Sequence, residues 1–200
     1  MAFFLNFVKI VELYGFFIIF VKIISDTPVL TSPMSRRSRL RCVCVFNSHI
    51  ISGAEQARIN MIEFMTEGVE MPRLDFDKVR RWIAQVASNH GYTVGNLTYC
   101  FCDDEYILET NRKFLQHDYY TDIITFDYTR RDRVGGDMVI SLDTVVSNAE
   151  QIGVTYDSEL LRVIIHGVLH LCGINDKGPG EREVMEAEEN KALSIYKDLR

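Results

Sequence analysis

Apolar and polar positions follow two different spacings along residues 59–200. In 76–89, apolar residues recur every three or four positions, which places Phe76, Val79 and Ile83 on one face of a helix. Asp103 and Ser158 each precede a run of this kind, and their side chains are suited to cap the first turn of a helix. The spacing predicts helices over 76–89, 103–115, 142–151, 159–172 and 181–198.

The segments between these helices have the character of β-strands. Residues 96–102 alternate between apolar and polar and are rich in residues that favour strands. Gly135 and Gly136 predict a turn into the last strand. The order of elements predicts an α/β (α+β) domain, with a small mixed sheet of about four strands covered by helices and with helix 159–172 at its centre. The predicted strands are 59–69, 96–102, 123–128 and 138–141.

Two histidines in the helix predicted over 159–172 are the strongest sign of chemistry. His166 and His170 are four residues apart, so both imidazoles lie on one face of the helix. Gly173 predicts the turn that ends this helix, and Asp176 brings a carboxylate three residues later. Three such ligands leave a fourth position open, as in catalytic zinc sites. We therefore predict one divalent metal ion, with zinc as the first choice, held by these three side chains.

Histidines that serve only in packing or capping are the alternative interpretation of this pair. The surrounding run, 163–171, is strongly apolar. Imidazoles buried there without partners would be costly, whereas a metal ion supplies a partner for both. The run therefore favours a metal site.

The spacing H-x-x-x-H-x-x-G-x-x-D is that of the metzincin proteases except at one position. Metzincins carry glutamate directly after the first histidine, as the general base. Here Gly167 stands at that position, and a glycine cannot transfer protons. The pattern favours metal-assisted hydrolysis but makes a standard peptidase less suitable.

Other motifs extend the comparison beyond the histidine pair. Residues 166–173 read H-G-V-L-H-L-C-G, residues 121–126 read T-D-I-I-T-F, and residues 136–141 read G-D-M-V-I-S, with Asn111 before the last two of these in the chain. With these motifs in this order, about residues 61–198 resemble the YbeY family, bacterial metal-dependent endoribonucleases of ribosomal RNA maturation.

The resemblance implies an endoribonuclease specific for single-stranded RNA, acting at the 3′ end of 16S rRNA and in ribosome quality control. It implies a cytoplasmic protein, with ribosomal RNA and the ribosome or its small subunit as partners. Catalysis would run through the metal held by His166, His170 and Asp176. Asp137 is a candidate proton acceptor, and Thr121 and Asp122 are candidates for the wall of the substrate pocket.

The chain departs from the family pattern at two positions. The family closes its motif with a histidine as third ligand, and Asp176 occupies that place here. A carboxylate is a harder ligand than imidazole and shifts the preference toward other divalent ions. The family also has an arginine where this chain has Leu115, so Arg112 and Lys113, one helical turn earlier, are the candidates for RNA contact.

Two other functions stay open at this point. The first is a metalloendopeptidase with metzincin-like ligand spacing. The second is a non-catalytic ribosome assembly factor in which the metal ion only stabilises the fold. The sequence indicates no oligomeric state.

Charge and cysteine content restrict the partners and the compartment. The chain has a net charge of −6, and residues 61–200 alone carry −10, which counts against RNA as a substrate unless a local basic groove binds it. Any RNA contact must come from a local group such as 112–113 or 130–133. The five cysteines form no C-x-x-C pair and their number is odd, which favours reduced thiols in a cytosolic protein.

Residues 1–58 are predicted to be an extension outside the domain 59–200. They are apolar at first and then basic at 36–41. Charged residues interrupt the apolar part before it reaches the ~18–20 residues that a membrane span requires, and a signal peptide is weakly indicated. We favour a start codon assigned too early, with Met61 or Met71 as the true start, over a membrane anchor or an ordered accessory segment. No membrane segment is expected in 59–200.

Overall fold

The computed structural model describes residues 6–8 and 61–199 of the chain. The predictions for the extension 1–58 therefore lie outside the described residues, apart from 6–8. Among the described residues, none of the helices combines the length and the hydrophobicity that a membrane span requires.

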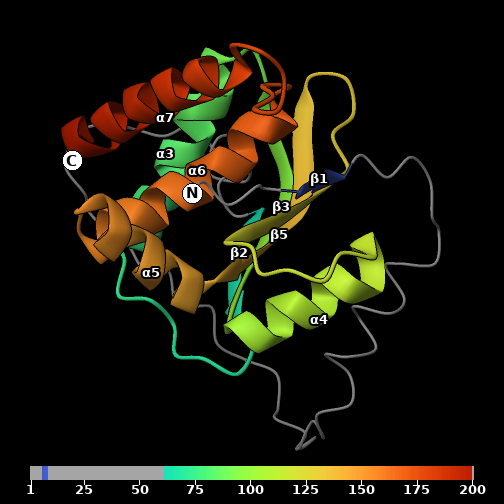
Figure 1. Ribbon diagram of the computed structural model, residues 1–200. Helices are drawn as coiled ribbons and strands as arrows, with labels where there is room; N and C mark the ends of the chain where they lie inside the picture. The colour runs from blue at the N-terminus through green and yellow to red at the C-terminus, as the bar shows by residue number, and fades with distance from the viewer. Residues whose placement is uncertain (1–5, 9–60, 200) are drawn as a thin grey trace, which may run out of the picture. The chain divides into compact units, whose positions relative to one another are not determined.

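The described residues contain a mixed five-stranded sheet in the order β1-β4-β5-β3-β2 (Figure 1). β4 and β5 are antiparallel, and all other neighbours are parallel. The four predicted strands are present, and β1 adds a fifth beside β4. The strands are β1 (Asn6–Val8), β2 (Ile62–Thr66), β3 (Thr93–Cys102), β4 (Ile123–Asp127) and β5 (Arg133–Ser141).

Helices lie on both faces of this sheet (Figure 1). On one face, Gly167 of α6 packs against Ile123 of β4 and Met138 of β5. On the other face, Phe114 of α4 meets Phe126 of β4 edge to face. The helices are α3 (Phe76–Asn89), α4 (Asp104–Leu115), α5 (Leu142–Ile152), α6 (Tyr156–Leu171) and α7 (Glu181–Asp198).

The hydrophobic core lies on the face of the sheet that α3, α6 and α7 cover. The α3 side chain Trp82 is fully buried and donates its indole N–H to the Ala192 carbonyl of α7, 2.6 Å away. Tyr99 of β3 is also fully buried, and its hydroxyl lies 3.5 Å from the Ile164 carbonyl of α6. The first contact joins α3 to α7, and the second joins α6, the helix that carries both histidines, to the sheet.

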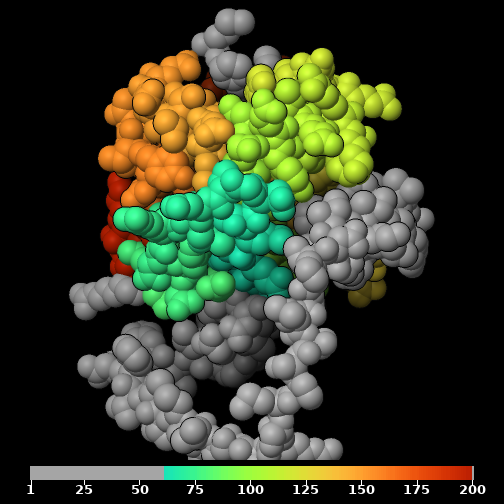
Figure 2. Space-filling view, turned by 90° about the horizontal axis from the view of Figure 1, so that it is seen from below, coloured from blue at the N-terminus to red at the C-terminus, as the bar shows by residue number. Residues whose placement is uncertain are grey.

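α4 and α5 adjoin on the surface of the molecule (Figure 2). Ser141 ends β5 and caps α5, where its hydroxyl accepts from the Thr144 N–H. Asp104 at the start of α4 accepts hydrogen bonds from the Ser141 and Thr144 hydroxyls. The two helices are therefore joined through polar side chains rather than through the core.

The predicted fold class and element order are confirmed, with two local corrections. α6 begins after Thr155, whose hydroxyl accepts from the Ser158 N–H, so Ser158 is not the cap. Gly135 and Gly136 lie inside β5 instead of forming a turn. A Cβ at Gly136 would stand 2.4 Å from the Phe126 carbonyl oxygen, so glycine is needed there for the close approach of two strands.

Candidate metal centre

α6 presents His166 and His170 side by side. Their ring centroids are 4.4 Å apart and the ring planes lie at 84°. Both residues are buried, with 6% of the surface of His166 and 2% of that of His170 exposed. The rest of the run 163–171 is apolar apart from Gly167, as the sequence indicated, so the two imidazoles are the polar side chains of this part of α6.

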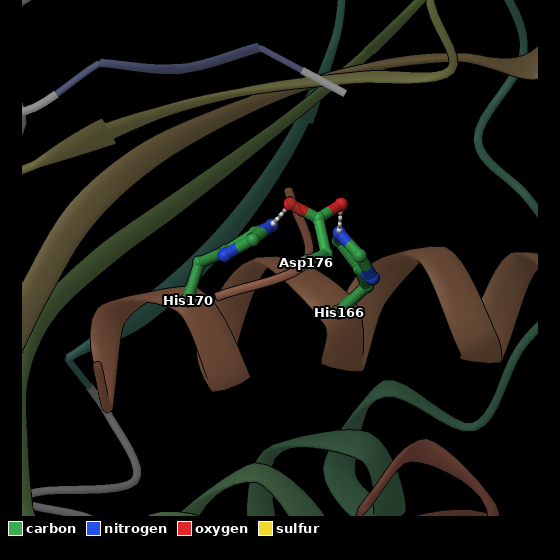
Figure 3. Close-up of side chains that lie close together, drawn as sticks. All are labelled: His166, His170 and Asp176. Carbon is green, nitrogen blue, oxygen red and sulfur yellow. Dashed lines mark ion pairs between the residues drawn. The ribbon is translucent and has the colours of Figure 1, made fainter. Parts of the chain in front are cut away.

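The turn after α6 brings Asp176 to the two histidines. Gly173 has φ +88°, a left-handed conformation that suits glycine, and it reverses the chain there. The Asp176 carboxylate then lies between the imidazoles, with one oxygen 3.8 Å from Nε2 of His166 and the other 3.8 Å from Nε2 of His170 (Figure 3). One ligand atom from each residue lies within 4.8 Å of the others, so this His–His–Asp group could hold a metal ion.

The geometry of this group fits a divalent ion. A separation of 3.8 Å is too long for a hydrogen bond. It suits two ligand atoms that each lie about 2.0–2.2 Å from a common ion. Nε2 of His166 is buried and makes no hydrogen bond with any described residue. A buried nitrogen of this kind is costly unless something binds it, and an ion at this point would do so.

The remaining ring nitrogens have acceptors of two kinds. Nδ1 of His170 donates to the Ile174 carbonyl at 2.8 Å. Nδ1 of His166 lies 2.6 Å from Oε1 of Glu189 in α7, and we assign the proton to the ring because the carboxylate can only accept. With the proton on Nδ1, each ring would direct its Nε2 lone pair toward Asp176. This is the tautomer that metal ligation through Nε2 requires.

A pocket of about 540 Å³ lies beside His166. His166 and Asp176 form part of its wall, together with Asp122, Arg162 and Glu189. The pocket therefore gives a ligand access to the side of the candidate metal centre.

Burial sets the electrostatics around this pocket. It raises the pKa of Asp122, against the effect of the charge on His166. It also raises the pKa of Glu159, with Arg162 acting in the opposite direction. Burial alone would raise the pKa of Glu189 as well, but its hydrogen bonds and charge interactions with His166 and Arg162 outweigh this and lower it. Glu189 is therefore held as a carboxylate.

The comparisons with known proteins point to one family. Residues 62–197 match the family model described as endoribonuclease YbeY. The chain belongs to this family. A protein named endoribonuclease YbeY from Phocaeicola vulgatus is 64% identical over 135 residues, which cover 68% of this chain and 98% of that protein. A protein of the same name from Bacteroides thetaiotaomicron is 61% identical over 134 residues, which cover 67% of this chain and 98% of that protein.

A solved structure agrees with the family assignment. The solution structure of a Thermotoga maritima protein matches this YbeY-family chain with a TM-score of 0.51 and 26% sequence identity, over 68% of this chain and 88% of the other. The family resemblance read from the motifs is thus confirmed. The match includes α6 and the turn after it, where the three candidate ligands lie.

In this YbeY-family chain, the position that holds the metzincin glutamate faces the sheet. A Cβ on Gly167 would stand 3.0 Å from both Cδ1 of Ile123 and Sδ of Met138. A longer side chain there would enter the core instead of reaching the histidines. The absence of the peptidase base therefore follows from the packing of α6 as well as from the sequence.

Asp122 and Thr121 are two further residues that the sequence analysis assigned to the site. Asp122 is buried, lines the pocket, and accepts from the Ile123 N–H and the Asn148 amide. Thr121 is buried next to it, and its hydroxyl bonds to the Ile123 carbonyl. Their proposed roles in the substrate pocket stay predictions.

Asp137 does not meet the histidines. It pairs with Phe126 across β4 and β5 and therefore shares the sheet face that α4 covers, whereas its neighbour Met138 faces α6. Its carboxylate bonds with the Thr98 and Tyr128 side chains. We therefore do not keep Asp137 as the proton acceptor.

Arg112 and Lys113 also lie away from the histidines, in the last turn of α4. Arg112 is exposed and forms an ion pair with Asp118, with 2.6 Å between Nε and Oδ1. Asn111 beside them is fully buried, and its amide donates to the Tyr119 carbonyl in the loop that leads to β4. If these two cations contact RNA, they would therefore bind a part of the RNA chain that lies away from the histidines.

Glu189 and Arg162 are site residues that the sequence analysis missed. Glu189 is on a charge-rich helix, 23 positions after His166. One signal was present: Glu189 falls on the stripe that α7 buries together with Met185, Ala192 and Leu193. A glutamate on an apolar stripe has to find a buried partner.

The metal-free protein is expected to become easier to unfold as the pH falls below about 6.5. Burial, helped by the charge of His166, lowers the pKa of His170 below its ordinary value of 6.5. Below that value the unfolded chain takes up a proton at this residue that the folded chain refuses, so stability falls. As the pH is lowered from about 7 to about 5, the denaturant concentration at the unfolding midpoint should therefore fall less steeply for His170→Asn than for the wild type. Equal slopes would contradict the lowered pKa.

Proposed function

We propose that this chain is a zinc-dependent endoribonuclease that cuts single-stranded RNA in ribosomal RNA maturation, at the 3′ end of 16S rRNA, and in ribosome quality control. The ribosome or its small subunit would be its partner, and the cytoplasm its location. The observation that carries the proposal is the convergence of His166, His170 and Asp176 on one point at the edge of a pocket. The names of the relatives support RNA as the substrate.

Each residue of the centre has a defined part in this proposal. His166 and His170 would hold the ion through Nε2, and Asp176 through a carboxylate oxygen. A bound divalent ion lowers the pKa of water and polarises a phosphoryl oxygen. The Ile174 carbonyl keeps His170 in the ligating tautomer, and Glu189 faces the corresponding nitrogen of His166. Asp122 would form the wall of the pocket that receives the RNA chain next to the ion.

The ligand spacing also favours a metalloendopeptidase as the second candidate. It is the spacing of the metzincins. The orientation of Gly167 toward Ile123 and Met138 weighs against it, because the usual general base has no place there. The third candidate, a ribosome assembly factor with a structural ion, predicts metal binding without hydrolysis.

Cleavage assays on the purified full chain separate these candidates. We expect cleavage of a single-stranded fragment from the 3′ end of precursor 16S rRNA, weak cleavage of the same sequence in a duplex, and none of casein. Chelation should abolish the activity and zinc should restore it. Metal-dependent cleavage of casein would instead support the peptidase. Loss of thermal stability on chelation, with no hydrolysis at any stage, would support the assembly factor.

Arg112 and Lys113 are proposed to bind RNA phosphates. If each neutralises one phosphate of a single strand, each alanine substitution should reduce the slope of log affinity against log salt by about 0.7. Fluorescence anisotropy with a labelled single-stranded RNA across a salt series measures this slope. Lys191→Ala is the matched control, because Lys191 is an exposed α7 cation paired with Glu188. Slopes that stay the same in both α4 variants would remove these residues from the RNA contact.

A further inference from the structure

The two histidines of the candidate metal centre are oriented by acceptors of different origin. His170 bonds to the backbone of its own turn, at Ile174. His166 bonds to Glu189, a side chain from a different helix. A backbone carbonyl in the same turn is fixed by local structure, whereas a glutamate from α7 reaches His166 only when α7 is packed on α6.

Glu189 is itself held from its other side. Its second oxygen, Oε2, accepts from Nη1 of Arg162 at 3.0 Å. Arg162 lies on α6 one turn before His166, and its Nε stands 3.6 Å from the Glu159 carboxylate. The carboxylate of Glu189 therefore has one oxygen on a guanidinium and one on an imidazole, which fixes its plane.

Burial makes this arrangement unlike an ordinary surface ion pair. Glu189 exposes 5% of its surface and His166 exposes 6%. A buried carboxylate is tolerated only when it is paired and hydrogen-bonded, and here both conditions are met. By contrast, the exposed carboxylate of Glu186 on α7 pairs with Arg182 of the same helix.

We propose that Glu189 is a positioning residue for His166, through which α7 fixes the orientation of a metal ligand. By accepting the Nδ1 proton, it keeps the Nε2 lone pair directed at the point between Asp176 and His170. Arg162 acts through Glu189, as its counter-charge. The inference rests on the metal-binding part of the proposed function and is independent of the substrate.

A group with this role changes metal affinity without touching the ion. Outer partners of metal-ligating histidines typically change affinity about 10–100-fold when they are removed. We expect a loss in this range for Glu189→Ala. Glu189→Gln keeps the size and one acceptor oxygen but loses the charge, so we expect a smaller loss. In both variants, the fraction of His166 that carries its proton on Nδ1 should fall.

The test uses the full chain and zinc alone. Zinc affinity is measured by competition with a chromophoric chelator, and the tautomer of His166 by long-range ¹⁵N–¹H NMR of the metal-free protein. Thermal unfolding of each metal-free variant establishes the temperature at which it is fully folded. Glu188→Gln is the matched control, because Glu188 is the adjacent residue of α7 and pairs with Lys191 and His90. Its zinc affinity and its His166 spectrum should equal those of the wild type.

Two results would overturn the inference. The first is a folded Glu189→Ala variant with lower thermal stability but wild-type zinc affinity, which would make Glu189 a structural link between α6 and α7. The second is an unchanged His166 tautomer in Glu189→Gln, the variant that carries the test if alanine prevents folding. Neither readout involves RNA, so a failure here is distinct from a failure of the proposed nuclease activity.

Discussion

Replacing His170 by alanine is expected to remove both zinc binding and RNA cleavage. The substitution deletes one of three ligands, and two ligands hold an ion far less firmly than three. The loss should exceed the roughly 10–100-fold that removal of an outer partner costs. Zinc affinity and the rate of cleavage of single-stranded RNA, measured on the same preparation, give the two values.

His90→Ala serves as the control for this experiment. His90 follows α3 and lies 3.6 Å from Glu188, apart from the candidate ligands. It should keep both zinc affinity and cleavage. Loss of cleavage in His170→Ala alone would then exclude a contaminating RNase common to all preparations. Unchanged cleavage in His170→Ala would remove this histidine from the reaction.

Introducing the metzincin glutamate at Gly167 is expected to destabilise the protein without making it a peptidase. The new side chain would enter the core between Ile123 and Met138, where its charge has no partner. An uncompensated buried charge costs about 3–5 kcal/mol, so Gly167→Glu should lose at least about 3 kcal/mol of unfolding free energy. Chemical denaturation measures the loss, and casein cleavage should not appear.

Gly167→Ala is the control that adds only a methyl group. It separates the effect of the charge and length of glutamate from the effect of adding a Cβ at this position. Its Cβ meets side-chain atoms at 3.0 Å, one of them on the flexible Met138, and alanine favours the helix by about 1 kcal/mol. We therefore expect a much smaller change in unfolding free energy than for glutamate. A stable Gly167→Glu variant that cleaves casein with zinc would mean that this position faces the metal centre.

Local features were the most predictable from the sequence. Helix α3 has the bounds that its apolar spacing predicts, 76–89, and the structure shows Asp75 as its cap, with the carboxylate accepting from the Lys78 N–H. The proximity of His166 and His170 was equally predictable, since four-residue spacing on a helix settles it. The turn at Gly173 likewise needs only the left-handed conformation that glycine adopts easily.

The features that the sequence did not predict depend on which elements pack together. Asp137 alternates with Met138 along β5, but the sequence does not state which of the two faces receives α6. Glu189 reaches His166 only through the packing of α7 on α6. Gly136 appeared to mark a turn because the close approach of the Phe126 carbonyl is a tertiary contact. In each case the missing information was the neighbouring element, not the residue's own propensity.

Elemental mass spectrometry of the full chain tests the central claim most directly. The chain, purified with zinc and freed of excess metal, would be compared with a His166→Ala/His170→Ala double variant, and circular dichroism would confirm that both are folded. We predict one divalent ion per wild-type chain and none in the variant. A folded wild-type chain that binds no metal, even after addition of zinc, would contradict the claim that His166, His170 and Asp176 form a metal centre.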